Sequence, residues 1–248
     1  MDLSGKVAIV TGARQGIGGA VTKALADAGA NLMLVSRSIS EEDEVVKYAK
    51  SLGRQVLVSR IDVSDRAQVE EMADTTLKVF GRVDILFNNA GISKPALLWK
   101  MTEAQWDEVI NVNLKGTFNC MQAVSKPMME QKSGAIINVT SSAGLMGTIG
   151  QVNYTAAKGG VYALTKSAAK ELAKYGITVN CIAPMAITEM TKTIATDPRF
   201  RDKYLERIPL GRFADPEEIG PTVVFLASDK ASYLTGQTIC IDGGMVML

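Results

Sequence analysis

The sequence predicts an α/β protein in which a parallel sheet is covered by helices on both faces. Short runs of β-branched and other apolar residues alternate with longer segments whose apolar residues recur every three or four positions. Most of the short runs contain consecutive apolar residues, which is typical of strands buried on both faces. With 248 residues and 47% apolar composition, the chain can bury a large core as a single domain.

The elements follow in order along the chain. Seven segments are predicted as strands: Val7–Thr11, Asn31–Ser36, Gln55–Ile61, Val83–Asn88, Ala135–Thr140, Thr178–Ala183 and Gln237–Ile241. Six segments are predicted as helices: Gly16–Ala28, Glu41–Leu52, Arg66–Phe80, Glu103–Gln131, Tyr154–Tyr175 and Pro216–Ala227. Pro184–Pro209 has no clear periodicity, which in a compact domain favours a functional lid. No repeat or linker divides the chain.

Composition excludes several classes of function. Lys plus Arg number 27 and Asp plus Glu 26, so no basic excess favours nucleic acid or an anionic membrane surface. The apolar stretch Val7–Val10 is too short for a signal sequence and no run reaches membrane-spanning length, which predicts a cytoplasmic protein. The three cysteines are far apart and are expected to be reduced and buried. The chain has no histidine, so we expect neither a Ser-His-Asp triad nor a metal site.

A glycine-rich loop directly follows the first strand and leads into a helix. It reads Thr11-Gly12-Ala13-Arg14-Gln15-Gly16-Ile17-Gly18. Glycines at such a turn let the backbone approach a pyrophosphate, whose charge is favoured at the helix N-terminus. No Gly-Lys-Ser/Thr follows, so a P-loop is not indicated. The loop predicts a dinucleotide site, and the alternative is a tight turn between strand and helix with no ligand.

The end of the second strand bears on the choice of cofactor. NAD sites commonly place an acidic residue here for the ribose 2′-hydroxyl, whereas an arginine accommodates the 2′-phosphate of NADP. This strand ends Val35-Ser36-Arg37-Ser38, with no acid before Glu41, and Arg14 offers a second cation. The pattern favours NADP(H), with NAD(H) as the alternative. Arg37 as a solvated surface cation is the competing interpretation.

The glycine loop is one of several motifs by which the chain resembles the short-chain dehydrogenase/reductase family over essentially its whole length. The motifs are Thr11-Gly12-x3-Gly16-x-Gly18, Asp62-Val63, Asn88-Asn89-Ala90-Gly91, Asn111-Val112-Asn113, Ser141, Tyr154-x3-Lys158 and Ile241-Asp242-Gly243-Gly244. The resemblance implies a doubly wound Rossmann-type sheet, with Asp62 and Val63 flanking the adenine. One departure is Pro184-Met185, where the family usually has Pro-Gly.

The loop, the second strand and the resemblance together predict a set of cofactor-binding residues. They are Gly12, Arg14, Gln15, Gly16, Ile17, Gly18, Ser36, Arg37, Asp62, Val63, Asn89, Ala90, Gly91, Tyr154, Lys158, Pro184, Ile187 and Thr188. We expect residues 1–248 to form one domain, with dinucleotide binding mainly in 1–140 and substrate binding and the lid mainly in 141–215.

By the same resemblance, Asn113, Ser141, Tyr154 and Lys158 match the family's catalytic tetrad. A free tyrosine has a pKa near 10, so it needs help to act as a base at neutral pH. Lys158 lies one helical turn after Tyr154, and its ammonium would stabilise a phenolate. Ser141 would donate to the substrate oxygen, or alternatively serve as a helix cap. Asn113 would hold water near Lys158, or alternatively be a buried structural amide.

The predicted function is an NADP(H)-dependent oxidoreductase that moves a hydride between nicotinamide and a ketone or secondary alcohol. A 3-oxoacyl thioester and a small ketone both suit the apolar residues expected near the site: Leu145, Met146, Ile149, Met185, Ile187 and Met190. An NAD-dependent secondary-alcohol or polyol dehydrogenase is the alternative, and a cofactor-binding redox sensor is the non-enzymatic one.

Two kinds of macromolecular partner are considered for such an enzyme. An acidic acyl carrier protein would need a basic patch, to which Lys126, Lys132 and Lys174 would contribute. The resemblance implies a homotetramer, with a dimer as the alternative, assembled through the two longest predicted helices and the apolar end Met245–Leu248.

Overall fold

The computed structural model describes all 248 residues and contains one seven-stranded sheet with the order β3-β2-β1-β4-β5-β6-β7. The strands are β1 (Val7–Thr11), β2 (Asn31–Val35), β3 (Val56–Ser59), β4 (Ile85–Asn88), β5 (Gly134–Val139), β6 (Ile177–Pro184) and β7 (Thr238–Ile241). Every pairing is parallel. The seven predicted strands are therefore confirmed, with no end displaced by more than two residues.

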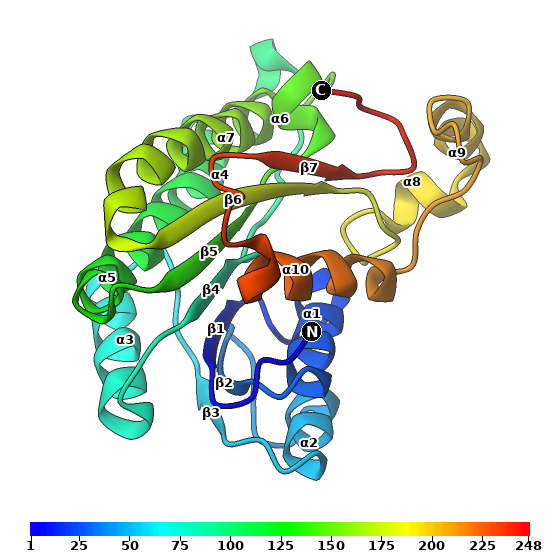
Figure 1. The fold of residues 1–248 in the computed structure, drawn as a ribbon. Coiled ribbons are helices and arrows are strands. Elements are labelled where there is room, and N and C mark those ends of the chain that lie inside the picture. The colour runs from blue at the N-terminus through cyan, green and yellow to red at the C-terminus, as the bar shows by residue number, and fades with distance from the viewer.

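Helices cover both faces of the sheet (Figure 1). One face carries α1 (Gly16–Asp27), α2 (Glu44–Ser51) and α10 (Gly220–Ala227). The other carries α3 (Arg66–Phe80), α4 (Glu103–Ile110), α5 (Gly116–Gln131) and α7 (Val152–Leu172). Both faces of the strands must be apolar to bury against these layers, which explains the consecutive apolar residues in the sequence.

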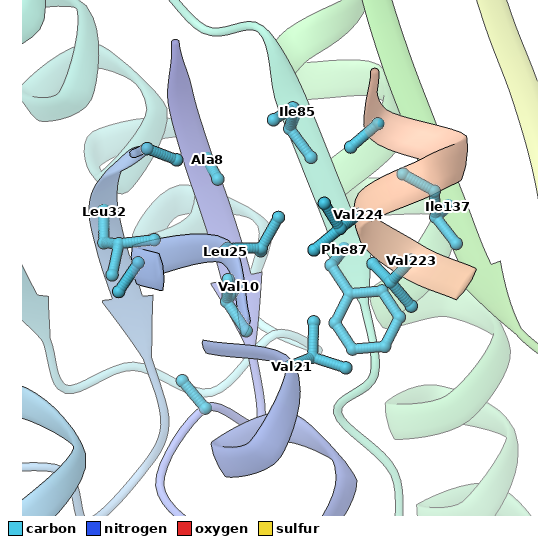
Figure 2. Close-up of a cluster of buried hydrophobic side chains, with 14 of the residues drawn as sticks. Ala8, Val10, Val21, Leu25, Leu32, Ile85, Phe87, Ile137, Val223 and Val224 are labelled. Carbon is cyan, nitrogen blue, oxygen red and sulfur yellow. The ribbon is translucent and has the colours of Figure 1, made fainter. Parts of the chain in front are cut away.

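Each layer of helices encloses its own hydrophobic core. In the first, Leu25 of α1 and Val223 of α10 pack with Phe87 of β4, as Figure 2 shows. In the second, Val124 of α5 packs on the opposite side of the sheet with Leu86 of β4. Neighbouring residues of one strand thus serve different cores, and the doubly wound Rossmann-type architecture predicted from the sequence is confirmed.

Several local features differ from the sequence prediction. The segment predicted as one regular helix over Glu103–Gln131 contains a π-helical turn at Asn111–Lys115, between α4 and α5. The irregular stretch before Pro209 contains two short helices, α8 (Lys192–Thr196) and α9 (Pro198–Leu205), and α6 (Ser142–Met146) follows β5. Short 3-10 turns occupy Leu98–Lys100, Ala173–Tyr175, Pro216–Ile219 and Asp229–Ala231.

The strand order places a crevice at one edge of the sheet. The chain leaves β1 toward β2 on one side, whereas β4 pairs on the other side of β1. At such a reversal the connections diverge beyond the carboxyl ends of the strands, which is where open α/β sheets bind ligands. The glycine loop after β1 and Ser141 after β5 lie at this edge.

Gly18 shows how closely the start of α1 packs against the loop before it. A Cβ on Gly18 would overlap the carbonyl oxygen of Gly12 and come 2.6 Å from Nδ2 of Asn89. Gly19, the next residue, has no such conflict, because its nearest neighbour, the carbonyl oxygen of Arg14, would lie 3.5 Å away. The two glycines have different roles although they are adjacent in one helix.

We therefore predict opposite effects of alanine at these two positions. Gly18→Ala should lower the free energy of unfolding by about 1–3 kcal/mol, because backbone has to shift to admit the methyl group. Gly19→Ala should be neutral or stabilise by about 0.5–1 kcal/mol, because alanine favours a helix interior over glycine. Urea denaturation of both variants provides the comparison. Equal stability of the two would contradict the packing described here.

Candidate active site

A cavity of about 860 Å³ opens at the carboxyl edge of the sheet. It is bordered by the segments that follow β1, β2, β3, β4, β5 and β6. Every residue predicted to bind the cofactor lines it except Gly18, which instead packs α1 against the glycine loop. Ser141, Tyr154 and Lys158 also line it, whereas Asn113 lies behind the wall. One cavity thus collects nearly all of the predicted site.

The glycine loop has the geometry that a pyrophosphate requires. Gly12 and Gly16 have backbone φ angles of +64° and +57°, which residues other than glycine rarely adopt. Gln15 precedes α1 in extended conformation and its side chain does not cap the helix. The N–H groups of the first turn therefore remain available at the positive end of the helix dipole, beside the cavity. These residues fit a dinucleotide phosphate.

Asn89 and Thr11 hold this loop against the neighbouring one. Nδ2 of Asn89 donates to the carbonyl oxygens of Thr11 and Gly12, at 3.2 Å each. Oγ1 of Thr11 accepts hydrogen bonds from the backbone N–H groups of Asn89 and Ala90 at 3.0 and 3.1 Å. The side chain of Asn89 is thereby used to join the loops after β1 and β4, and Ala90 and Gly91 are left to form the cavity wall.

The far end of the cavity carries the residues expected around an adenosine. Asp62 accepts hydrogen bonds from the N–H and hydroxyl of Ser64 at 2.9 and 2.7 Å. Burial opposes ionisation of Asp62, but these hydrogen bonds and the charge of Arg37 lower the pKa of this carboxyl below its usual range. Asp62 is therefore an anion with fixed orientation, next to the buried Val63.

The two arginines proposed for a 2′-phosphate differ in their surroundings. Nε of Arg14 donates to Asp43 at 3.0 Å, and Nη1 donates to Ser38 at 3.3 Å. Arg37 is exposed at the end of β2 and makes no ion pair. The sequence interpretation missed Asp43, because its partnership with Arg14 spans 29 positions and has no local pattern. Arg37 is thus the cation of this wall without an acidic partner.

Lys158 is a charged residue held inside the protein. Its side chain is only 3% exposed, and Nζ donates to the carbonyl oxygen of Val139 at 2.8 Å. Nζ lies 5.8 Å from the ring centroid of Tyr154, so the predicted proximity of ammonium and tyrosine is present. Burial lowers the pKa of Lys158 to about 8, because desolvation disfavours the charged form.

Tyr154 and Ser141 face the same cavity from α7 and from the end of β5. Burial raises the pKa of Tyr154 to about 12, and a hydrogen bond with Ser141 acts in the opposite direction. Ser141 also accepts a hydrogen bond from the N–H of Ala143 at 3.2 Å and so caps α6. Capping occupies a lone pair of this oxygen and leaves its proton free to be donated, so a cap and an oxyanion donor are compatible.

Asn113 occupies the π-helical turn and is fully buried. Its Nδ2 donates to the carbonyl oxygens of Ile92 and Val109, and its Oδ1 accepts from the N–H of Ile92 at 3.2 Å. These bonds join the turn to the loop after β4, where a Cβ on Gly91 would overlap Oδ1 of Asn113. The side-chain amide is therefore a satisfied structural group. It supports the wall behind Lys158 without reaching the cavity.

The substrate end of the cavity is partly apolar. Met185, Ile187 and Met190 line it, whereas Leu145, Met146 and Ile149 do not. Met185 is 8% exposed and lies outside both hydrophobic cores. Its φ is not left-handed, and its N–H donates to the carbonyl oxygen of Ile241 at 2.9 Å. The Pro184-Met185 departure is thus accommodated without backbone strain, and its side chain adds apolar surface to the cavity.

The start of the lid is fixed by a threonine that the sequence interpretation did not single out. Oγ1 of Thr191 accepts from the N–H of Thr188 at 2.8 Å and donates to the carbonyl oxygen of Ala186 at 2.7 Å. All three residues line the cavity. The spacing of Thr188 and Thr191 is the local signal that would have indicated such a turn.

Fold and site together define an oxidoreductase that binds a dinucleotide at the glycine loop and places acid–base groups beside it. A family model described as Enoyl-(Acyl carrier protein) reductase matches residues 12–246. The chain belongs to the short-chain dehydrogenase/reductase family, whose members are NAD(P)-dependent oxidoreductases acting on alcohol or ketone groups.

Individual relatives match over nearly their whole length. A 3-oxoacyl-(acyl-carrier-protein) reductase of Staphylococcus epidermidis is 48% identical, with 98% of this chain and 99% of the relative covered. One of Thermotoga maritima is 47% identical, with both chains covered completely. A solved structure from Sinorhizobium meliloti, described as a short-chain alcohol dehydrogenase, superposes with a TM-score of 0.94 at 38% identity, covering 98% of this chain and 97% of the other.

None of the helices of this chain combines the length and apolar character needed to span a membrane. No group of three or more Cys, Asp or Glu side chains is arranged to hold a metal ion.

The buried charge of Lys158 leads to a prediction about stability. A pKa of about 8, compared with the ordinary value of 10.5, means that folding opposes protonation of this group. The resulting cost, about 3 kcal/mol at pH 7, is present in full below pH 8 and is relieved as pH rises toward 10.5. We expect Lys158→Met to gain stability relative to the wild type at pH 7, and this relative gain to be about 2 kcal/mol smaller at pH 9.5.

Urea denaturation of the wild type and the variant at both pH values measures this difference. The exposed Lys170 on the same helix provides the matched substitution, Lys170→Met. If the difference in free energy of unfolding between the wild type and Lys158→Met does not change with pH, the burial of a titrating ammonium is contradicted.

Proposed function

We propose that this protein is an NADPH-dependent reductase of 3-oxoacyl thioesters, with Tyr154 as its acid. The observation that carries the proposal is the convergence of Ser141, Tyr154 and the buried Lys158 on one cavity that begins at the glycine loop. The substrate class is supported by the names of the relatives, which are 3-oxoacyl-(acyl-carrier-protein) reductases at 46–48% identity. The apolar side chains at the substrate end suit an acyl chain.

In the proposed reaction, Ser141 and Tyr154 hold the substrate carbonyl oxygen between their hydroxyl groups. When bound, the reduced nicotinamide supplies the hydride that reaches the carbonyl carbon. Tyr154 gives its proton to the carbonyl oxygen as negative charge develops there, and becomes a phenolate. The hydroxyl of Ser141 donates to the same oxygen and lowers the energy of the charged state.

Lys158 makes this proton transfer favourable. Burial, opposed by the hydrogen bond with Ser141, raises the pKa of Tyr154 to about 12, so a phenolate in this cavity needs a nearby positive charge. The ammonium of Lys158 faces the ring and is fixed by Val139, so little reorganisation is needed when the proton leaves. Asn113 holds the loop behind Lys158 through its side-chain amide. Its backbone carbonyl oxygen accepts a hydrogen bond from the hydroxyl of Thr117 at 2.8 Å, and its second lone pair would hold the water that returns a proton to the site.

The preference for NADPH rests on the wall around the end of β2. Ser36, Arg37 and Ser38 offer hydroxyl and guanidinium donors to a 2′-phosphate. Asp43 pairs with Arg14, and this pairing leaves Arg37 free of that carboxylate. NAD(H) would instead be favoured by an acidic residue at this strand end.

We further propose how the chain is divided and assembled. Residues 1–140 mainly hold the dinucleotide and 141–215 mainly hold the substrate and the lid. A homotetramer in the cytoplasm is proposed, supported by the exposed Leu98, Trp99 and Phe118 near α4 and α5 and by the exposed end Met247-Leu248. The acyl group would be presented as a carrier-protein thioester.

The basic residues expected to bind that carrier lie away from the cavity of their own subunit. Lys126, Lys132 and Lys174 are exposed, but Lys132 ends α5 just before β5, and Lys174 lies just before β6. Both therefore sit near the amino ends of these strands, at the edge opposite the cavity. The proposal of carrier binding therefore rests on the relatives' names.

Thioester reduction separates the proposed function from its alternatives. Neither an NAD-dependent polyol dehydrogenase nor a redox sensor would reduce a thioester.

Our first functional prediction concerns turnover and Tyr154. The purified protein should oxidise NADPH in the presence of acetoacetyl-coenzyme A faster than with simple ketones or sugars. Tyr154→Phe should reduce kcat by about 10²–10⁴-fold, because the acid is removed while the ring remains. NADPH binding, followed by fluorescence, should persist.

Tyr162→Phe, at a partly exposed tyrosine two turns further along α7, is the matched control and should keep wild-type activity. Full activity of Tyr154→Phe would refute the mechanism. Faster turnover of a sugar than of the thioester would refute the substrate class.

A second functional prediction concerns the cofactor. The wild type should bind NADPH more tightly than NADH, and Arg37→Asp should reverse the order, because it replaces a phosphate-binding cation with a ribose-binding anion. Fluorescence titration with both cofactors gives the ratio of dissociation constants. Arg66→Asp, at an exposed arginine on α3, is the control for the change of net charge. A wild-type preference for NADH would overturn this assignment of Arg37.

A further inference from the structure

The chain segment that carries Ser141 rests directly on the helical turn that carries Lys158. A Cβ on Gly144 would come 2.7 Å from the carbonyl carbon of Lys158 and 2.8 Å from the backbone nitrogen of Gly159. Nζ of Lys158 in turn donates to the carbonyl oxygen of Val139, two residues before Ser141. The end of β5, the start of α6 and one turn of α7 therefore form a single packed unit.

Thr140 lies at the centre of this unit. It is 1% exposed, and its backbone N–H donates to the carbonyl oxygen of Ile182 in β6 at 2.9 Å. Its hydroxyl crosses to α7 and donates to the backbone carbonyl oxygen of Lys158 at 2.7 Å. One residue thus connects β5, β6 and α7, and it directly precedes Ser141. Thr140 also borders the cavity, but its hydroxyl proton is already donated to the carbonyl oxygen of Lys158, so we assign it no reacting role.

This bond sets the separation of two groups that the proposed reaction uses. Lys158 is held at both ends, its carbonyl oxygen by Thr140 and its ammonium by Val139. Both holding residues are neighbours of Ser141 in the sequence. We propose that Thr140 is a positioning residue whose hydroxyl fixes the Lys158 turn of α7 against the end of β5, and so maintains the spacing of Ser141, Tyr154 and Lys158. The inference rests on the catalytic roles proposed above.

A second threonine in the same interface separates positioning from simple stabilisation. Oγ1 of Thr165 accepts from Nδ2 of Asn138 in β5 at 2.9 Å and donates to the carbonyl oxygen of Val161 at 2.8 Å. It joins the same strand to the same helix and is equally buried, but it lies about two turns beyond Lys158. Loss of either hydroxyl removes one buried bond between β5 and α7, and only Thr140 acts on the turn with Lys158.

The test compares Thr140→Val, Thr140→Ser and Thr165→Val with the wild type. Valine keeps the shape of threonine and removes the hydroxyl, whereas serine keeps the hydroxyl. With NADPH and acetoacetyl-coenzyme A, Thr140→Val should lower kcat about tenfold, since small misplacements of reacting groups have effects of this order or larger. Its affinity for NADPH, measured by fluorescence, should stay within about twofold of the wild type, and Thr140→Ser should restore kcat to within about twofold.

Thr165→Val should lower the melting temperature about as much as Thr140→Val does, and should leave kcat unchanged. Wild-type kcat in Thr140→Val would overturn the proposal. So would an equal loss of kcat in Thr165→Val, or failure of Thr140→Ser to restore activity. If Thr140→Val does not fold, the smaller Thr140→Ala takes its place with the same expectations.

The outcome is distinguishable from failure of the proposed substrate. If the wild type does not reduce acetoacetyl-coenzyme A, the thioester proposal fails, and the same variants are compared with a diketone such as 2,3-butanedione as the probe. A tenfold loss restricted to Thr140→Val on that probe still supports positioning. A wild type that reduces neither compound contradicts both proposals.

Discussion

The site depends on one ammonium group that the protein holds out of water. The charged form of Lys158 would be more stable in water than in the protein interior, and the lowered pKa of this group reflects the free-energy cost of burying the charge. Nζ of Lys158 donates a hydrogen bond to the carbonyl oxygen of Val139 at 2.8 Å. The arrangement is retained only because the surrounding sheet and helices are rigid enough to hold it, with apolar cores on both faces. In the proposed reaction, this buried charge is what allows a neutral tyrosine to give up its proton.

The position of that charge follows from the topology of the sheet. Because the strands are parallel, the loops after β1, β4, β5 and β6 all lie at one edge of the sheet. Helix α7 passes the same edge and places Tyr154 and Lys158, which are one helical turn apart, beside these loops. Close backbone contacts then fix the loops, as Gly18 does against Gly12 and as Gly144 does against α7. At these contacts glycine lets two backbone segments approach more closely than a side chain would allow. The walls of the cavity are therefore held in fixed positions.

Sequence reasoning predicted the strands and the cavity wall well because both depend on local patterns. The apolar runs identified all seven strands, and short motifs such as Tyr154-x3-Lys158 have fixed spacing on a helix. Contacts between distant segments were not predictable in this way. Asp43 neutralises Arg14 across 29 positions, and the hydroxyl of Thr140 reaches Lys158 across 18. The π-helical turn at Asn113 was missed because the hydrogen bond that accompanies it, to Ile92, is likewise non-local.

Asn113 illustrates how a residue can support the wall of a site without entering it. Its amide makes three hydrogen bonds with backbone and faces no ligand, so its chemistry is exhausted in holding the loop of Gly91 and Ile92. The extra residue of the π turn is what brings the amide to that loop, since a regular helix would place it differently. The loop forms the wall beside Lys158, and a Cβ on Gly91 would stand 3.7 Å from Nζ. The π turn is thus connected to the ammonium of Lys158 through two contacts, from Asn113 to the loop of Gly91 and from that loop to Lys158.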